Sequence, residues 1–258
     1  MESSPEPQKP DFSIAEEIIM NNRIVTADML KNLPEPAQRY LNYTGVIGKP
    51  WIDTVRVTYT GTFRLGADKP WMPIKAEQFY TTNPPGFHWK ARFKMFGLWI
   101  VSGSDTYKAG HGHMFGKIAG LYTIFDARGE ELDQGTMMRY LNEMTWFPIA
   151  LLSDYVTWQA VDDRSFDVTF TDYGRSVTAR FIIDDEGCLL NFVTKRYREN
   201  KGKYTLDTWT TPMTEWGTLA GLNLPIRGQA VWKLPDGDLP YADLKLTEVE
   251  YNGKIEPF

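Results

Sequence analysis

The residues best placed to do chemistry lie in the segment 126–148. Arg139 and Glu143 are four residues apart, and Trp146 follows three residues after Glu143. On a helix these spacings bring the three side chains to one face. If that face meets the rest of the protein, desolvation beside a Trp raises the pKa of the carboxylate, which can then act as a general acid or base. Arg139 would hold an anionic group. The alternative is an exposed ion pair that contributes little to stability.

The side chains expected around a bound molecule extend from this helix to predicted strands. The expected ligand-binding residues are Arg139, Trp146, Tyr140, Met138, Tyr80 and Trp89. Aromatic rings and methionines supply apolar contact area, with core packing as the alternative for each of them. Glu77 shares a strand face with Phe79, which makes it a candidate inward-pointing carboxylate, with a surface position as the alternative. If the protein is an enzyme, Glu143 and Glu77 are its catalytic candidates.

Histidine and cysteine give weaker signals. His111 and His113 are two residues apart, so on a strand they would face the same way and could chelate a metal ion with a carboxylate. The glycines beside them indicate a turn instead, and His88 is the one other histidine in the sequence. The single cysteine, Cys188, excludes an intramolecular disulfide and a Cys-rich metal site. We therefore predict no metal site.

Basic residues alternate with apolar ones along one predicted strand. His88, Lys90, Arg92 and Lys94 fall on one face, while Trp89, Ala91 and Phe93 fall on the other. A solvated outer face of a sheet is the usual explanation. A basic surface for an acidic partner is the alternative, although the net charge of −5 does not support it.

The elements that must position these residues change in type along the chain. Residues 1–13 form a polar arm, and helix-like spacing follows over Ile14–Met20, Thr26–Leu33 and from Pro36 to about Tyr43, where Gly45 ends it. From residue 51 the pattern alternates and is punctuated by Gly and Pro. The predicted strands are 55–60, 74–80, 87–95, 98–108, 113–118, 121–126, 156–160, 165–171, 176–183, 189–197, 204–215, 226–233 and 242–251.

One helix interrupts this series, from about Gln134 to Thr145, with Asp133 as its expected N-cap. No alternation of strands and helices and no glycine-rich phosphate loop is present, so we predict no nucleotide cofactor or other cofactor. The sequence predicts a mostly β, α+β fold: a large curved antiparallel sheet, or half-barrel, with N-terminal helices and one central helix covering its concave face. We expect one domain over residues 14–258, helical over 14–50 and antiparallel sheet over 51–258.

Composition limits the function classes. The 258 residues are 42% hydrophobic and 14% aromatic, and the isoelectric point is about 5.3. An acidic chain has no overall positive field that would attract nucleic acid. Residues 1–10 lack the basic start and apolar core of a signal peptide, and no run approaches the roughly 18 apolar residues of a spanning helix. These features favour a cytoplasmic protein without stable membrane insertion.

Several motifs occur in an order that resembles an uncharacterised bacterial family of domains of unknown function. The motifs are L-P-x-P-x-x-R-Y-L at residues 33–41 and R-Y-L-x-E-x-x-W-F-P at residues 139–148, followed by Asp172-Tyr173-Gly174 and the segment 232–237. The resemblance spans about residues 33–251. It implies a single domain on a curved antiparallel sheet, broadly similar to the half-barrels of lipoprotein carriers, and it implies no reaction.

Two functions remain open from the sequence. The leading hypothesis is a half-barrel that binds a small apolar or lipid-like molecule on its aromatic concave face, under the helix that carries Arg139, Glu143 and Trp146. The alternative places a metal- and cofactor-independent hydrolase, isomerase or cyclase in the same cavity, with Glu143 or Glu77 as acid and base. A protein with a filled interior that acts as a structural or interaction module is a third reading.

Overall fold

The strands form one large antiparallel sheet. The computed structural model describes residues 23–200 and 202–254, and over these residues fourteen strands hydrogen-bond into a single sheet. Their bounds are β1 (Thr54–Phe63), β2 (Met72–Thr82), β3 (Pro85–Met95), β4 (Leu98–Lys108), β5 (His111–Ile118), β6 (Tyr122–Ala127), β7 (Val156–Asp162), β8 (Ser165–Asp172), β9 (Arg175–Ile183), β10 (Leu189–Asn200), β11 (Lys203–Thr210), β12 (Met213–Leu219), β13 (Leu222–Leu234) and β14 (Gly237–Tyr251).

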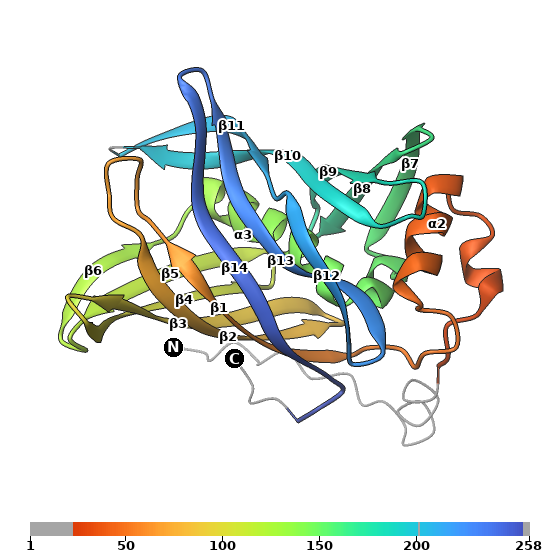
Figure 1. Ribbon diagram of the computed structural model, residues 1–258, viewed down its shortest axis with the longest axis horizontal. Coiled ribbons are helices and arrows are strands. Elements are labelled where there is room, and N and C mark those ends of the chain that lie inside the picture. Colours follow the sequence, from red (N-terminus) through yellow and green to blue (C-terminus); the bar gives the residue numbers. More distant parts are fainter. Residues whose placement is uncertain (1–22, 201, 255–258) are drawn as a thin grey trace, which may run out of the picture.

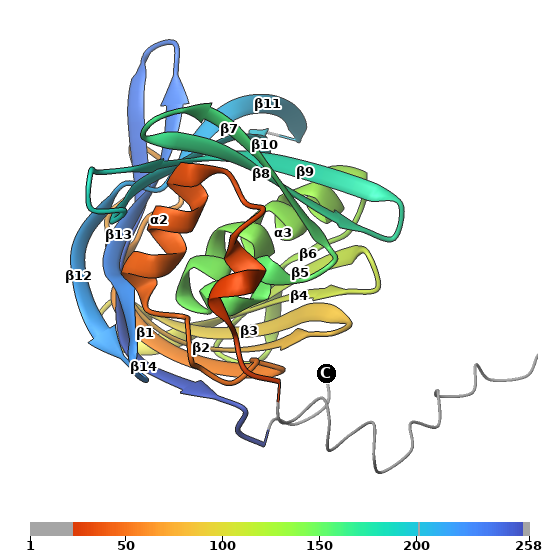
Figure 2. The same cartoon turned by 90° about the vertical axis from the view of Figure 1, so that its right-hand side faces the viewer.

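The sheet has two arms that meet at the last strand. Its order is β6-β5-β4-β3-β2-β1-β14-β13-β11-β10-β9-β8-β7, with β12 paired to β13 beside this path. Figures 1 and 2 show that the sheet curls around helix α3 (Glu130–Glu143) on three sides. This arrangement confirms the predicted mostly β fold, with a curved antiparallel sheet and a central helix on its concave side.

Helix α3 is buried around much of its circumference because both arms of the sheet pack against it. Met137, Met138, Tyr140 and Leu141 are each at most 2% exposed. The helix packs mainly on β4, β5, β9 and β10. Gly112 of β5 permits the close approach, since a Cβ atom there would lie 2.5 Å from the Thr136 hydroxyl oxygen. The interior beneath the helix is therefore filled by side chains.

The helix starts one turn earlier than the sequence predicts. Gly129 is the N-cap residue, so Asp133 lies inside the helix instead of capping it. The Asp133 carboxylate accepts hydrogen bonds from the Gly112 backbone N–H (2.7 Å) and from Arg175 (2.5 Å), and so ties α3 to β5 and β9. Acidic residues stabilise the whole first turn of a helix. Because several of them occur here, the sequence pattern does not fix the residue at which the helix begins.

The N-terminal part covers one end of the curled sheet. A 3₁₀ helix, η1, spans Ala27–Leu30, where the sequence predicts a longer helix over 26–33. Helix α2 spans Glu35–Thr44 and ends at Gly45, which has a φ of 75°. It packs against β7, β8 and β13, as Figure 2 shows. The predicted arm (1–13) and the predicted helix over 14–20 lie outside the described residues.

The prediction of one continuous strand over 204–215 is wrong. The structure divides it into β11 and β12, separated by Thr211 and Pro212. Because proline has no backbone N–H, it cannot continue a hydrogen-bonded ladder. Strand β11 pairs with β10 and with residues 231–233 of β13, whereas β12 leaves this path and pairs with residues 222–228 of β13.

Beside the part covered by α3, the concave face carries a second aromatic region. Rings of β3, β1, β14 and β13 contact one another in a chain, with centroid separations of 5.5–6.3 Å. We call this chain the aromatic belt; it consists of Trp89, Phe93, Phe63, Tyr241 and Trp232. Three of its members, Trp89, Phe63 and Tyr241, are only half-buried. The belt is therefore the part of the concave face that α3 leaves partly open.

Candidate functional site

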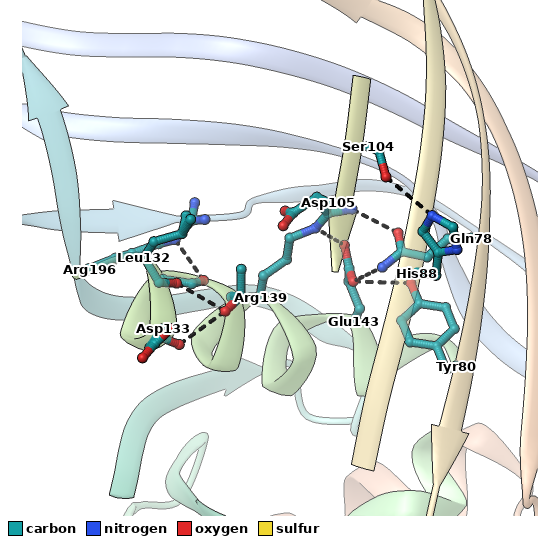
Figure 3. A network of polar contacts seen from close by, with 12 residues as sticks. Gln78, Tyr80, His88, Ser104, Asp105, Leu132, Asp133, Arg139, Glu143 and Arg196 are labelled. Atoms are coloured by element: carbon teal, nitrogen blue, oxygen red, sulfur yellow. Dashed lines mark hydrogen bonds and ion pairs between the residues drawn. The ribbon is translucent and has the colours of Figure 1, made fainter. Parts of the chain in front are cut away.

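A buried polar cluster lies where the aromatic belt meets helix α3 (Figure 3). Arg139 of α3 is its centre. The guanidinium donates from Nη1 to Asp105 Oδ2, from Nε to Glu143 Oε1 and from Nη2 to Gln78 Oε1, each at 2.7 Å. Asp105 comes from β4 and Gln78 from β2, so the cluster joins three elements. The prediction that Arg139 and Glu143 share an inward face of the helix agrees with this geometry.

Both carboxylate oxygens of Glu143 have hydrogen-bond partners. Its Oε1 pairs with Arg139, and its Oε2 accepts hydrogen bonds from Gln78 Nε2 (2.7 Å) and the Tyr80 hydroxyl (3.1 Å). Only 6% of the residue is exposed. Both oxygens of this carboxylate are therefore occupied by partners from the protein, and neither is directed at a free space for a substrate.

The charges of the cluster perturb one another strongly. Burial opposes the charge of Arg139, but the negative charges of Glu143 and Asp105 outweigh it, so the pKa of Arg139 is well above its usual value. Burial raises the pKa of Asp105 to about 6, although Arg139 and Arg196 act in the opposite direction. Asp105 therefore titrates nearer neutrality than an exposed aspartate does.

Two polar atoms beside the cluster make no hydrogen bond of good geometry, although the Trp89 indole is close enough to the Tyr59 hydroxyl to lower the pKa of Tyr59 against the effect of burial. Asp105 Oδ1 and Trp89 Nε1 are two of only four buried side-chain N or O atoms without a hydrogen bond among the described residues. The two residues stand directly opposite each other on β4 and β3. A carboxylate oxygen accepts and an indole N–H donates, so one hydroxyl group that reached both atoms could accept from Trp89 and donate to Asp105.

Arg196 of β10 links the cluster to the aromatic belt. Its guanidinium lies over the rings of Trp209 (4.8 Å) and Trp232 (5.9 Å), and it donates to the carbonyl oxygen of Gly135 in α3 (3.1 Å). On the other arm, the Arg139 guanidinium lies 4.9 Å from the Trp89 ring. The polar cluster is thus continuous with the belt on both sides of the concave face.

The structure divides the predicted ligand-binding residues into two groups. Arg139, Tyr80 and Trp89 belong to the cluster, and Trp146 reaches it through Tyr59, whose ring is 5.6 Å away. Tyr140 and Met138 are buried in the core, where Tyr140 stacks on Phe170 at 5.2 Å. The space under the helix, where the sequence places the ligand, is therefore occupied by core side chains.

The prediction that Glu77 points inward is wrong. Gln78 and Tyr80 of β2 face α3, so Glu77 and Phe79 face the outer side of the sheet. There the Glu77 carboxylate accepts a hydrogen bond from Arg56 Nε at 2.7 Å. It cannot share a site with Glu143.

Sequence reasoning missed Asp105, Gln78 and Tyr59. A signal for Asp105 exists in the alternation of β4, where Val101, Gly103, Asp105 and Tyr107 occupy the buried positions. A charged residue in a series of buried positions usually needs a counter-charge.

The two histidines pair with different carboxylates. His111 contacts Asp133 at 3.1 Å, whereas His113 contacts Asp126 at 2.7 Å. Within residues 23–200 and 202–254, no group of three or more His, Cys, Asp or Glu residues could hold a metal ion.

Comparison with known proteins places this architecture in a family. Residues 23–244 match DUF6544, a family of unknown function. The chain belongs to the DUF6544 family. No curated protein matches the sequence.

Two solved structures are similar to the DUF6544 chain in the path of the backbone. A DUF1329 family protein from Desulfovibrio piger is 9% identical, with a TM-score of 0.48 and coverage of 86% of this chain and 93% of that one. A LolA superfamily protein from Nitrosomonas europaea is 10% identical, with a TM-score of 0.45 and coverage of 90% and 96%.

Proposed function

We propose that the concave face binds a small amphipathic molecule, with its apolar part on the aromatic belt and a neutral hydroxyl-bearing head at Asp105 and Trp89. The observation that carries this proposal is the buried Asp105 Oδ1 without a hydrogen bond, on the residue that faces Trp89 across the β3–β4 hairpin, beside half-buried rings. Leaving a buried polar atom unsatisfied costs free energy, so such atoms call for a partner from outside the protein.

The charges favour a neutral head over an anionic one. Arg139 is already neutralised by two carboxylates, Asp105 and Glu143, so a third anion there would gain little from its charge. An anion placed beside the open oxygen of Asp105 would be repelled by it. A hydroxyl satisfies both open atoms without adding charge, as in a long-chain alcohol or a monoacylglycerol.

The test is a displacement assay on the full chain. The fluorescent probe N-phenyl-1-naphthylamine is bound first, and dodecanol, dodecanoate and dodecylamine then compete for its site. We expect dodecanol to displace the probe at a lower concentration than dodecanoate at pH 8. In Asp105→Asn this preference should shrink, because the repelling charge is gone.

Two matched controls separate recognition from packing. Trp89→Phe keeps a ring but removes the donor, and should weaken dodecanol binding about two- to tenfold, the usual range for one hydrogen bond. Trp158→Phe makes the same change outside the belt and should leave binding unchanged. No uptake of the probe, or equal effects of Trp89→Phe and Trp158→Phe, would refute the proposal. Mass spectrometry of organic extracts identifies the natural molecule.

The same open carboxylate favours a second candidate, an acid–base enzyme in this site. The proton-transferring group would be Asp105, whose pKa is raised to about 6, and not the fully bonded Glu143. Conversion of the extracted molecule by the wild type, lost in Asp105→Asn while binding is retained, would favour the enzyme. Unchanged recovery of that molecule after incubation would favour simple binding.

A further inference from the structure

Large apolar side chains gather at one rim of the β1–β6 arm. Strands β1 to β6 pair in sequence order, so the turns β1–β2, β3–β4 and β5–β6 fall on the same edge, at the left of Figure 1. We call residues 64–71, 96–99 and 119–124 the hairpin rim. Its most exposed apolar residues are Phe96 (91%), Leu121 (80%), Leu65 (73%) and Tyr122 (70%). Isolated exposed apolar residues are ordinary, but several at successive turns mark an interaction surface.

The tip of the β3–β4 hairpin is shaped in a way that packing does not require. Phe96 has a φ of 50° and precedes Gly97, which has a φ of 82°. Both central residues of this tight turn need a positive φ, where Asn, Asp or Gly is usual and a bulky residue is strained. Since the Phe96 ring is almost wholly exposed, the fold gains nothing from it. The same conformation before a glycine recurs at Ala109, Ala119, Tyr173 and Ala220, so what sets Phe96 apart is a large apolar ring that is 91% exposed.

The strands that flank the rim are basic, in contrast to the chain as a whole. The segments 60–76, 90–104 and 111–125, which contain the three turns, include seven Lys or Arg residues and one acidic residue, Asp68. The whole protein carries a net charge of −5. The positive charge is therefore concentrated around the exposed apolar tips.

A hollow on the outer face lies directly behind the rim. It has a volume of about 650 Å³ and is lined by Lys75, Lys90, Arg92, Trp99, Ser102 and Ser104, among others. The Lys75 ammonium lies 5.1 Å from the Trp99 ring, whereas Glu77, an acidic group in the same hollow, is paired with Arg56. Three cations and two hydroxyls on one wall suit the phosphate of a lipid headgroup.

We propose that the hairpin rim is a docking surface for an anionic lipid bilayer. The apolar tips enter the boundary between headgroups and acyl chains, and the basic residues contact the phosphates. Only turns take part, which agrees with the finding that no helix of the described residues is long and apolar enough to cross a membrane. Phe63 is the last residue of β1 and Phe93 lies two residues before the end of β3, so docking would bring this end of the belt close to the bilayer surface.

Flotation with lipid vesicles tests this surface without any ligand for the concave face. The full chain is mixed with vesicles of pure phosphatidylcholine or of phosphatidylcholine with 30% phosphatidylglycerol, and the bound fraction is measured. We expect binding to the anionic vesicles, weakened by salt. Phe96→Ser with Leu121→Ser should lower the partition coefficient at least tenfold. Lys90→Gln with Arg92→Gln should lower it about 25-fold, at roughly fivefold per charge.

Matched control variants lie at the other end of the molecule. Val161→Ser removes an exposed apolar residue, and Arg164→Gln removes an exposed charge, both at the β7–β8 hairpin. Neither should change binding. The proposal is overturned if the wild type ignores anionic vesicles or binds neutral ones equally well. It is also overturned if the protein forms a dimer that Phe96→Ser with Leu121→Ser dissociates, because a second copy then covers the rim. Failure of the dodecanol assay leaves this result unaffected, so the two proposals fail separately.

Discussion

Replacing Arg139 by Met tests whether the buried cluster holds the β1–β6 arm of the sheet to helix α3. Methionine keeps much of the apolar volume but removes the charge. The substitution abolishes three hydrogen bonds of 2.7 Å and leaves the carboxylates of Asp105 and Glu143 buried without their counter-charge. Breaking a buried ion pair in this way typically costs about 3–5 kcal/mol. We expect a loss in that range in the free energy of unfolding at pH 8.

The cost should depend on pH. Without Arg139, the pKa of Asp105 rises above its value of about 6, because the guanidinium is what lowers it against burial. At pH 5 the carboxylic acid is then neutral in the variant, and the charge no longer has to be buried. The destabilisation should therefore be clearly smaller at pH 5 than at pH 8. Adding Asp105→Asn to Arg139→Met should restore part of the stability at pH 8.

Urea denaturation followed by tryptophan fluorescence measures these free energies at both pH values. Arg180→Met is the control, since Arg180 forms a half-exposed pair with Asp167 on the outer face and should cost less than about 1 kcal/mol. If Arg139→Met costs no more than Arg180→Met, or costs the same at pH 5 and pH 8, the reasoning about the cluster is refuted.

Three further predictions concern single positions. Folding raises the pKa of Asp105 from 3.8 to about 6, so the native state binds the proton more tightly than the unfolded state does. The free energy of unfolding should therefore fall by roughly 3 kcal/mol as pH rises from about 4 to 6. Urea denaturation of Asp105→Asn should no longer show this decline. Gly112→Ala should destabilise the protein by about 1–3 kcal/mol, because the new methyl group collides with Thr136; an unchanged urea midpoint would contradict this. Glu77→Gln should change stability by less than about 1 kcal/mol and leave dodecanol binding intact, since its pair with Arg56 is on the outer face.

Much of the sheet could be predicted because its strands alternate and glycines punctuate its turns. Strand β4 spans Leu98–Lys108, with the bounds that the sequence predicts, and Gly45 ends α2. The face of β2 could not be predicted in the same way. Phe79 on one face and Tyr80 on the other are both aromatic, so composition gives no preference. The face was decided by α3, which follows about fifty residues later and packs on the side of Gln78 and Tyr80.

The site shows the same division between local and long-range information. The pairing of Arg139 with Glu143 is local to one helix, and the spacing alone brings them together. The pairing with Asp105 and Gln78 depends on strand register and on how far the sheet curls, which no local pattern contains. The open donor and acceptor arise from that register too, because Trp89 and Asp105 are set opposite each other by the β3–β4 hairpin.

The concave face and the hairpin rim are connected through the same three hairpins. Strands β1 and β3 carry Phe63 and Phe93 of the belt on their inner face, and their turns carry Leu65 and Phe96 at the rim. An apolar path of a few residues therefore leads from the open Asp105–Trp89 pair to the tips. If both proposals hold, Phe96→Ser with Leu121→Ser should slow transfer of dodecanol from anionic vesicles to the protein while leaving its affinity in free solution unchanged. A change in affinity without a change in transfer would show that the rim belongs to the binding site and does not act as a separate docking surface.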